Sequence, residues 1–116
     1  MPDYLCLLYN EDTDEAGRAA RWAELPRWLA LTERMREAGV WLANNPLHDV
    51  EAATTVRVRG GDVQMTDGPF ATTKEFLAGY YLLRCADLDE ALHWAAQLPT
   101  AEYGSVEVRP VLDLDG

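Results

Sequence analysis

The residues best suited to chemistry are a few carboxylates beside turn formers or a histidine. Asp67 is the strongest candidate, because it opens the string Asp67-Gly68-Pro69-Phe70 at the exit of an apolar hairpin. Apolar neighbours strengthen a carboxylate as a base, so Asp67 could act as a general base or bind a ligand cation together with Gly68, Pro69 and Phe70. The same composition is typical of an Asx-turn, in which Asp67 only orders the backbone. Both interpretations remain open.

Two further pairs of polar residues could contribute to such a site. Lys74 and Glu75 could form a polar mouth to a cavity, or a solvated patch of surface. His48 and Asp49 are an adjacent histidine and carboxylate, in which the histidine could take a proton and the aspartate could orient it. Adjacent side chains in an extended loop point apart, so an exposed pair without a catalytic role is the alternative.

The histidines and cysteines are too few and too scattered to predict a metal site. The chain has two of each, and Cys6 and Cys85 fall in separate apolar runs without a ligand spacing. A site made of His48 and carboxylates stays open. No glycine-rich phosphate loop or G-x-S-x-G string occurs, so we expect no cofactor. The two cysteines are predicted to be buried free thiols in a reducing compartment.

The overall charge argues against nucleic acid as a partner. Twenty acidic residues face ten basic ones, which gives a formal charge of −10, and the arginines are scattered along the chain. The start of the chain lacks the basic residues and the length of a signal peptide, and no apolar run approaches the roughly 20 residues of a membrane span. We therefore expect a cytoplasmic protein that contacts no membrane.

Hydrophobic periodicity predicts one domain over residues 1–116. The expected elements, in chain order, are a strand at 4–9, a helix at 26–38, a hairpin at 55–65, a strand at 79–85, a helix at 87–98 and a strand at 106–112. This order is typical of an α+β fold, most simply a ferredoxin-like one, with a mostly antiparallel sheet and two helices on one face.

Turn and capping residues refine these elements. Pro26 suits the first turn of a helix and Gly39 its end, while Asp87 begins an N-terminal capping box. The segment 19–25 is either a preceding short helix or part of the same helix, kinked at the proline. The two-residue turn Gly60-Gly61 predicts that Val58 pairs with Val63 and that Val56 pairs with Met65.

The two strands expected at the centre are apolar on both faces. Two helices on one face leave the other face bare, and a large exposed apolar patch is unusual in a monomer. We therefore expect a homodimer in which two sheets enclose an aromatic-lined cavity. Tyr81, in the strand 79–85, is a candidate ligand-binding residue of this cavity.

A series of short strings carries a resemblance to a known family. In order, they are ATTVRV at 53–58, TDGPF at 66–70, TKE at 73–75, GYYL at 79–82, DLDEAL-WA at 87–95 and GSVEVRPV at 104–111. On these strings the chain resembles the DGPF-type proteins of the YCII-related superfamily.

The resemblance implies a dimeric α+β barrel, and many DGPF-type proteins look like partners of bacterial sigma factors. In the wider superfamily a histidine and an aspartate are proposed to act on small molecules. Here the place of that histidine is taken by Trp28, and its acid would fall near Asp49 or Glu51. Thr72 and Ala78 also depart from the DGPF pattern, which has Glu and Gly there.

Two functions follow from these observations. The first is a dimeric module that binds a small ligand or regulates a partner such as a sigma factor, which the missing histidine favours. The second is a cofactor-free lyase or isomerase, with Asp67 or Asp49 as the proton carrier in the cavity.

Overall fold

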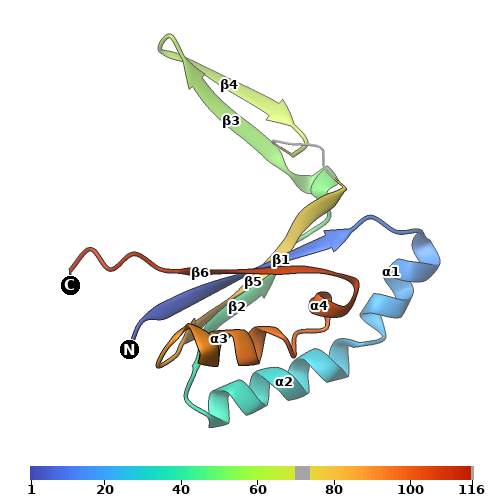
Figure 1. Cartoon of the computed structure of the whole chain (residues 1–116). Helices are drawn as coiled ribbons and strands as arrows, with labels where there is room; N and C mark the ends of the chain where they lie inside the picture. Colours follow the sequence, from blue (N-terminus) through green and yellow to red (C-terminus); the bar gives the residue numbers. More distant parts are fainter. Residues whose placement is uncertain (70–73, 116) are drawn as a thin grey trace.

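In the part of the chain that the structure describes, four strands form the main sheet, and each pairs antiparallel with its neighbours in the order β2–β5–β1–β6 (Figure 1). The computed structural model describes residues 1–69 and 74–115. The strands of this sheet are β1 Asp3–Glu11, β2 Trp41–Pro46, β5 Glu75–Arg84 and β6 Gly104–Pro110. The two apolar strands predicted to be central, β1 and β5, are central. The predicted α+β class with a mostly antiparallel sheet is confirmed.

Three helices, α2, α3 and α4, lie on one face of this sheet, while α1 lies beyond one end of it (Figure 1). The bounds of these helices are α1 Glu15–Trp22, α2 Leu25–Glu37, α3 Leu88–Ala95 and the single turn α4 Thr100–Tyr103. The segment before Pro26 could have been a separate helix or part of one kinked helix, and the structure shows a separate helix, α1. This helix starts where Asp14 accepts a hydrogen bond from the Gly17 N–H at 2.8 Å. Within the described residues, no helix combines the length and the apolar character of a membrane span.

The helix predicted at 26–38 is confirmed within one residue at each end as α2. The helix predicted at 87–98 starts as predicted but ends earlier, at Ala95. Pro26 lies in the first turn of α2, where its missing N–H costs no hydrogen bond. Gly39, just beyond the end of α2, has a φ of 75°, which glycine adopts without strain. Asp87 caps α3 by accepting a hydrogen bond from the Glu90 N–H at 2.9 Å.

The core lies between the helices and the sheet face that they cover, which we name the covered face. It is formed by alternate residues of the central strands, such as Tyr4, Cys6 and Leu8 of β1, because successive side chains of a strand point to opposite faces. The buried cluster comprises Tyr4, Cys6, Leu8, Leu31, Met35, Val40, Tyr81, Leu83, Cys85, Ala91, Ala95 and Leu98.

The hairpin departs from the prediction in its position. Its strands, β3 Thr54–Arg59 and β4 Asp62–Asp67, have the predicted pairing of Val58 with Val63 and of Val56 with Met65. They form a separate two-stranded sheet instead of joining the main one, and Figure 1 shows them projecting away from the body. We name this hairpin the arm.

The strand β2, which the sequence analysis missed, takes the place in the main sheet that the hairpin was expected to fill. Its sequence, WLANNP, has two asparagines and a proline, residue types that are depleted in strands. It pairs through its backbone with β5, for example Asn45 with Tyr80, and the Asn45 side chain donates to the Tyr80 hydroxyl at 2.8 Å. Such pairing depends on tertiary contact, so local propensity did not reveal it.

Candidate functional site

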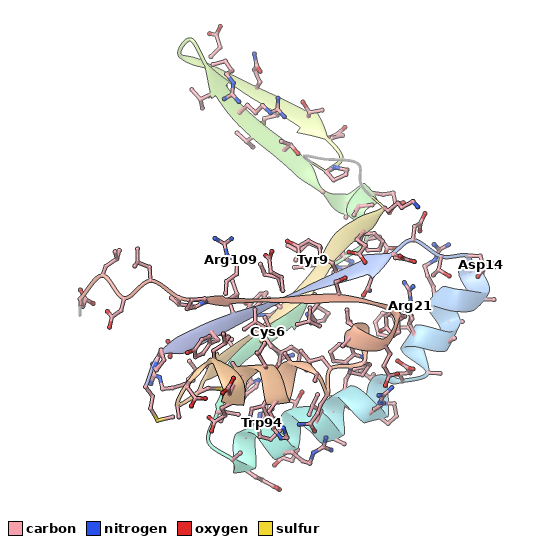
Figure 2. All side chains as sticks on the ribbon, viewed as in Figure 1. Cys6, Tyr9, Asp14, Arg21, Trp94 and Arg109 are labelled. Carbon is pink, nitrogen blue, oxygen red and sulfur yellow. The ribbon has the colours of Figure 1, made fainter. Side chains whose placement is uncertain are left out.

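The main sheet has one face that none of the described helices covers, and we name it the open face. It is formed by the residues that alternate with the core residues, so Leu5 pairs with Leu82 and Leu7 with Tyr80 on this side. These side chains are half-buried by one another. Figure 2 shows Tyr9 and Arg109 on the open face, with Trp94 among the helices on the opposite side. The open face is thus an apolar floor that the described part of the chain leaves uncovered.

One end of the open face forms a polar depression of about 620 Å³, which we name the mouth. The lining residues are Tyr9, Glu11, Lys74, Glu75, Ser105 and Glu107. Glu75 accepts a hydrogen bond from the Ser105 hydroxyl at 3.1 Å, which ties β5 to β6 across this end. Lys74 and Glu75 thus line the same depression as two further carboxylates and the Tyr9 ring.

Four of the lining residues were missed by the sequence analysis, namely Tyr9, Glu11, Ser105 and Glu107. They come from β1 and β6, so only the pairing of the strands brings them beside Glu75. Glu11 pairs with Glu75 and Tyr9 pairs with Ser105, and this register was the signal that could have found them. Across residues 1–69 and 74–115, no three His, Cys, Asp or Glu side chains form a cluster that could hold a metal ion.

Tyr81 lies on the covered face, so it faces α2 and not the open face. Its hydroxyl lies 2.7 Å from the Thr32 Oγ1, and its ring stacks on Trp28 with the centroids 6.0 Å apart. Burial raises the pKa of Tyr81, and the hydrogen bond with Thr32 partly opposes this rise. Trp28 is therefore a packing partner of Tyr81 at the position where the superfamily histidine is expected.

Asp67 ends β4 at the base of the arm, and its side chain is exposed in the single chain. The turn that follows is held by the backbone of Gly68, which has a φ of 103°. Its N–H donates to the Ala53 carbonyl at 2.7 Å, and its carbonyl accepts from the Thr55 hydroxyl at 3.0 Å. Pro69 is exposed, and Phe70 lies outside the described residues. One chain alone does not place Asp67 among the aromatic residues of β5.

His48 and Asp49 lie in the loop between β2 and the short 3₁₀ helix Val50–Ala52, and both side chains are exposed. The Asp49 carbonyl accepts a hydrogen bond from the Ala52 N–H at 2.9 Å, which starts this turn. The predicted pair therefore sits in solvent at the entry to the arm.

The two thiols are free and buried, as predicted. Burial raises the pKa of Cys6 to about 12 and that of Cys85 to about 11. A thiol must ionise to act as a nucleophile, so neither is suited to covalent catalysis near neutral pH.

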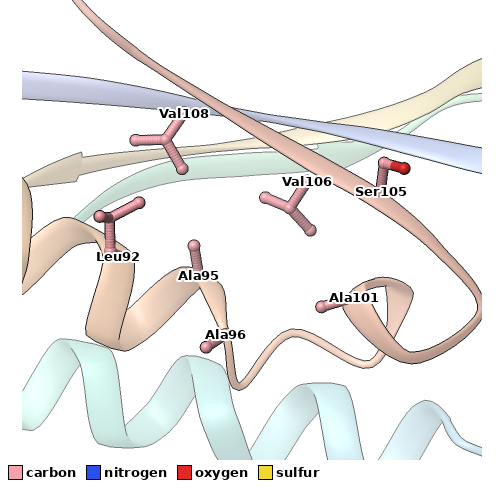
Figure 3. Close-up of a pocket in the computed structure, with 7 residues that line it drawn as sticks. All are labelled: Leu92, Ala95, Ala96, Ala101, Ser105, Val106 and Val108. Carbon is pink, nitrogen blue, oxygen red and sulfur yellow. The ribbon is translucent and has the colours of Figure 1, made fainter.

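A second hollow, of about 330 Å³, lies between α3 and β6 on the covered side of the sheet (Figure 3). Its lining residues are Leu92, Ala95, Ala96, Ala101, Ser105, Val106 and Val108. None of them ionises near neutral pH, so this hollow offers no group for proton transfer.

The fold and the site define a class of protein, namely an α+β protein with helices on one face of its sheet and an apolar open face on the other. Residues 3–115 match the model of the YCII-related domain, and the chain therefore belongs to that family. It is also 40% identical over 112 residues to an uncharacterized protein of Rhizobium meliloti (strain 1021), in an alignment covering 93% of this chain and 90% of the relative.

Proposed function

We propose that this protein is a small-ligand-binding or regulatory module that works as a homodimer, with the open faces of two copies enclosing a shared cavity. The observation that carries the proposal is the open face itself. Its central residues, among them Leu5, Leu7 and Leu82, are apolar although no described element covers them. A face of this kind usually marks an interface or a ligand site.

The topology of the main sheet supports the proposal that a second copy of the chain covers the open face. The strand order β2–β5–β1–β6, with the long helices on one side, is the order of a ferredoxin-like sheet. Two such sheets can pack face to face about a twofold axis, which is the dimeric α+β barrel that the resemblance to DGPF-type proteins implies. The centre of the open face would then be desolvated while its charged rim, such as the pair Asp3 and Arg84, stays in water.

The cavity of such a dimer would suit a ligand with an apolar body and a polar end. Leu82 and Tyr80 would contact the body, because they lie on the apolar floor. Lys74 and Glu75 would contact the polar end, because both line the mouth. Ligand sites are commonly built in this way, from an apolar wall and a few polar groups that fix orientation.

A regulatory partner is part of the same proposal. The resemblance to DGPF-type proteins makes a bacterial sigma factor the partner to test first. The buried thiols are compatible with a reducing cytoplasm, which is where such a partner works.

The placement of the candidate residues favours binding over catalysis as a lyase or isomerase. Trp28 packs on Tyr81 where the superfamily histidine is expected, so a base is missing there. Asp67, Asp49 and His48 are exposed in the single chain, so none of them lies in a site that excludes water.

The mass in solution tests the dimer. Light scattering after size exclusion should give about twice the 13.0 kDa of one chain. Leu7→Glu places a charge on the open face and should give a folded monomer. Leu29→Glu makes the same change at an exposed position on α2 and should leave the dimer intact. A wild-type mass of 13 kDa at micromolar concentration would contradict the proposal.

Native mass spectrometry of the untreated protein tests the ligand. We expect the dimer to carry a small molecule through purification, and Asp67→Asn to keep the dimer but lose that mass. If the variant instead unfolds, Asp67 only forms the turn. If the bound compound is converted to product on incubation, the lyase or isomerase function is favoured.

A further inference from the structure

The arm exposes an apolar face that residues 1–69 and 74–115 leave uncovered. Val56 and Val58 are each 58% exposed, Val63 is 60% exposed and Met65 is 73% exposed. The pairing of Val56 with Met65 and of Val58 with Val63 puts all four on the same side of the hairpin. They form one continuous stripe.

Asp67 lies on this same side, at the base of the arm. Residues two apart in a strand share a face, so Val63, Met65 and Asp67 point the same way. The pairing of Asp67 with Thr54 continues the stripe toward the body. Whatever covers the apolar stripe therefore also approaches the Asp67 carboxylate.

A hairpin of two strands is only marginally stable in water unless something packs on its apolar face. None of the described helices and strands packs extensively on β3 or β4 besides the two strands themselves. The cover must therefore come from outside the chain described.

We propose that the arm crosses onto a second copy of this chain, seats its Val and Met stripe there and brings Asp67 into the shared cavity. This inference rests on the proposed homodimer. It makes the site composite, because the base of the arm would complete a cavity whose floor and mouth belong to the main sheets.

Three features favour a second copy as the occupant. Figure 1 shows the arm rising from one end of the main sheet on the side away from the helices, so a copy seated on the open face would stand beside it. A stable interface buries roughly 800 Å² on each partner, and a stripe of four side chains is too small for that alone. A second copy that contacts both the arm and the open face would bury a larger area, as a stable interface requires.

The third feature is charge. The strands of the arm carry two arginines and two aspartates, namely Arg57, Arg59, Asp62 and Asp67, so the arm is formally neutral. The whole chain has a formal charge of −10. The arm is thus a part of the molecule that can approach an acidic second copy without net repulsion.

The dissociation constant of the full-length dimer, measured by analytical ultracentrifugation, tests the inference. The double change Val58→Ser and Val63→Ser should raise it by about tenfold or more, because central apolar contacts dominate interfaces. Gln64→Ser, on the other side of the same strand, should change it by less than about threefold. Unchanged circular dichroism of both variants would show that the main sheet is intact.

Photo-crosslinking tests directly whether the arm contacts a second chain. Met65→p-benzoylphenylalanine should crosslink two chains and give twice the mass of one, while Gln64→p-benzoylphenylalanine should not. A wild-type dimer that tolerates the double serine change and crosslinks only within one chain would overturn the inference about the arm, yet leave the proposed function standing. A wild-type monomer would overturn both.

Discussion

Leu82 and Leu83 are neighbours in β5, yet their side chains point to opposite faces of the sheet and differ in burial. Leu83 is fully buried on the covered face beneath the helices, and Leu82 is half-buried on the open face. The same contrast runs along β1, where Cys6 is buried between Leu5 and Leu7. At the centre of the sheet both faces of these strands carry large apolar residues, whereas the ends of the open face carry charged ones such as Asp3 and Arg84. What differs is that the helices of the described residues cover one face and not the other.

This comparison separates two uses of apolar residues. On the covered face they stabilise the fold within one chain. On the open face they are available for association or for a ligand. Changes on the two faces should therefore have different consequences, and four experiments test this.

The largest effect is expected from a charge on the covered face. Leu83→Asp buries a carboxylate without a partner, which costs several kcal/mol against a total stability of about 5–15 kcal/mol. We expect no folded protein by circular dichroism. The matched change Leu82→Asp should keep the helical signal and the thermal transition of a folded chain while abolishing association. If both variants failed to fold, the two faces would not differ in their contribution to the stability of a single chain.

Alkaline pH should lower the free energy of unfolding through the two thiols, Cys6 and Cys85, which are buried in the core. In the unfolded chain the thiols ionise near pH 9.0, whereas in the fold the pKa of Cys6 is about 12 and that of Cys85 about 11. The folded state thus keeps protons that the unfolded state releases. The free energy of unfolding should therefore fall as the pH rises from about 9 to 12, by about 1.4 kcal/mol per pH unit for each thiol while it is ionised only in the unfolded chain.

Urea unfolding at several alkaline pH values measures this loss. In the double variant Cys6→Ala and Cys85→Ala, the slope between pH 9 and 11 should be much smaller. The same slope in both proteins would show that the thiols do not cause it.

A smaller effect is expected at the hydrogen bond between Tyr81 and Thr32. Tyr81→Phe keeps the ring on Trp28 but leaves the Thr32 hydroxyl without this partner, which should cost about 1 kcal/mol. A double-mutant cycle with Thr32→Val measures the coupling. Additive losses would show that the two hydroxyls do not interact.

The smallest effect on stability is expected from loss of the ion pair between Asp3 and Arg84, at the rim of the open face. Arg84 donates to Asp3, Nε to Oδ1, at 2.8 Å, and this bond holds the pKa of Asp3 below its usual value of 3.8. The contribution to stability is present above pH 3.8 and is lost as the pH falls through the lower pKa of the folded state. Asp3→Asn should lower the melting temperature slightly at pH 7 and leave it unchanged near pH 2. An equal decrease at both pH values would point to packing instead.

The sequence predicted what local patterns determine. The apolar runs of β1 and β5, the cap at Asp87, the helix end at Gly39 and the pairing across Gly60-Gly61 are all set by residues close together in the chain. Those predictions are confirmed. The strand β2 was missed because Asn44, Asn45 and Pro46 do not favour a strand, and only pairing with β5 holds them in one. The hairpin was then assigned to the main sheet in its place.

The site was harder to predict than the fold, since its residues are brought together by strand register. Lys74 and Glu75 are adjacent in the chain, whereas Glu11 and Glu107 reach the mouth from β1 and β6, which are distant in sequence. Tyr81 was chosen for its aromatic ring, but the side to which it points depends on which face the helices cover. For strands that are apolar on both sides, periodicity carries no such information.

The two prolines at the ends of β2 and β6 have a consequence for assembly. These strands flank the main sheet among the residues described, and Pro46 and Pro110 are their last residues. A proline has no N–H to offer an incoming strand, so it hinders the addition of further chains along the sheet edge. Copies are thereby steered away from open-ended fibre growth and toward closed assemblies of fixed size, even in a crowded cell.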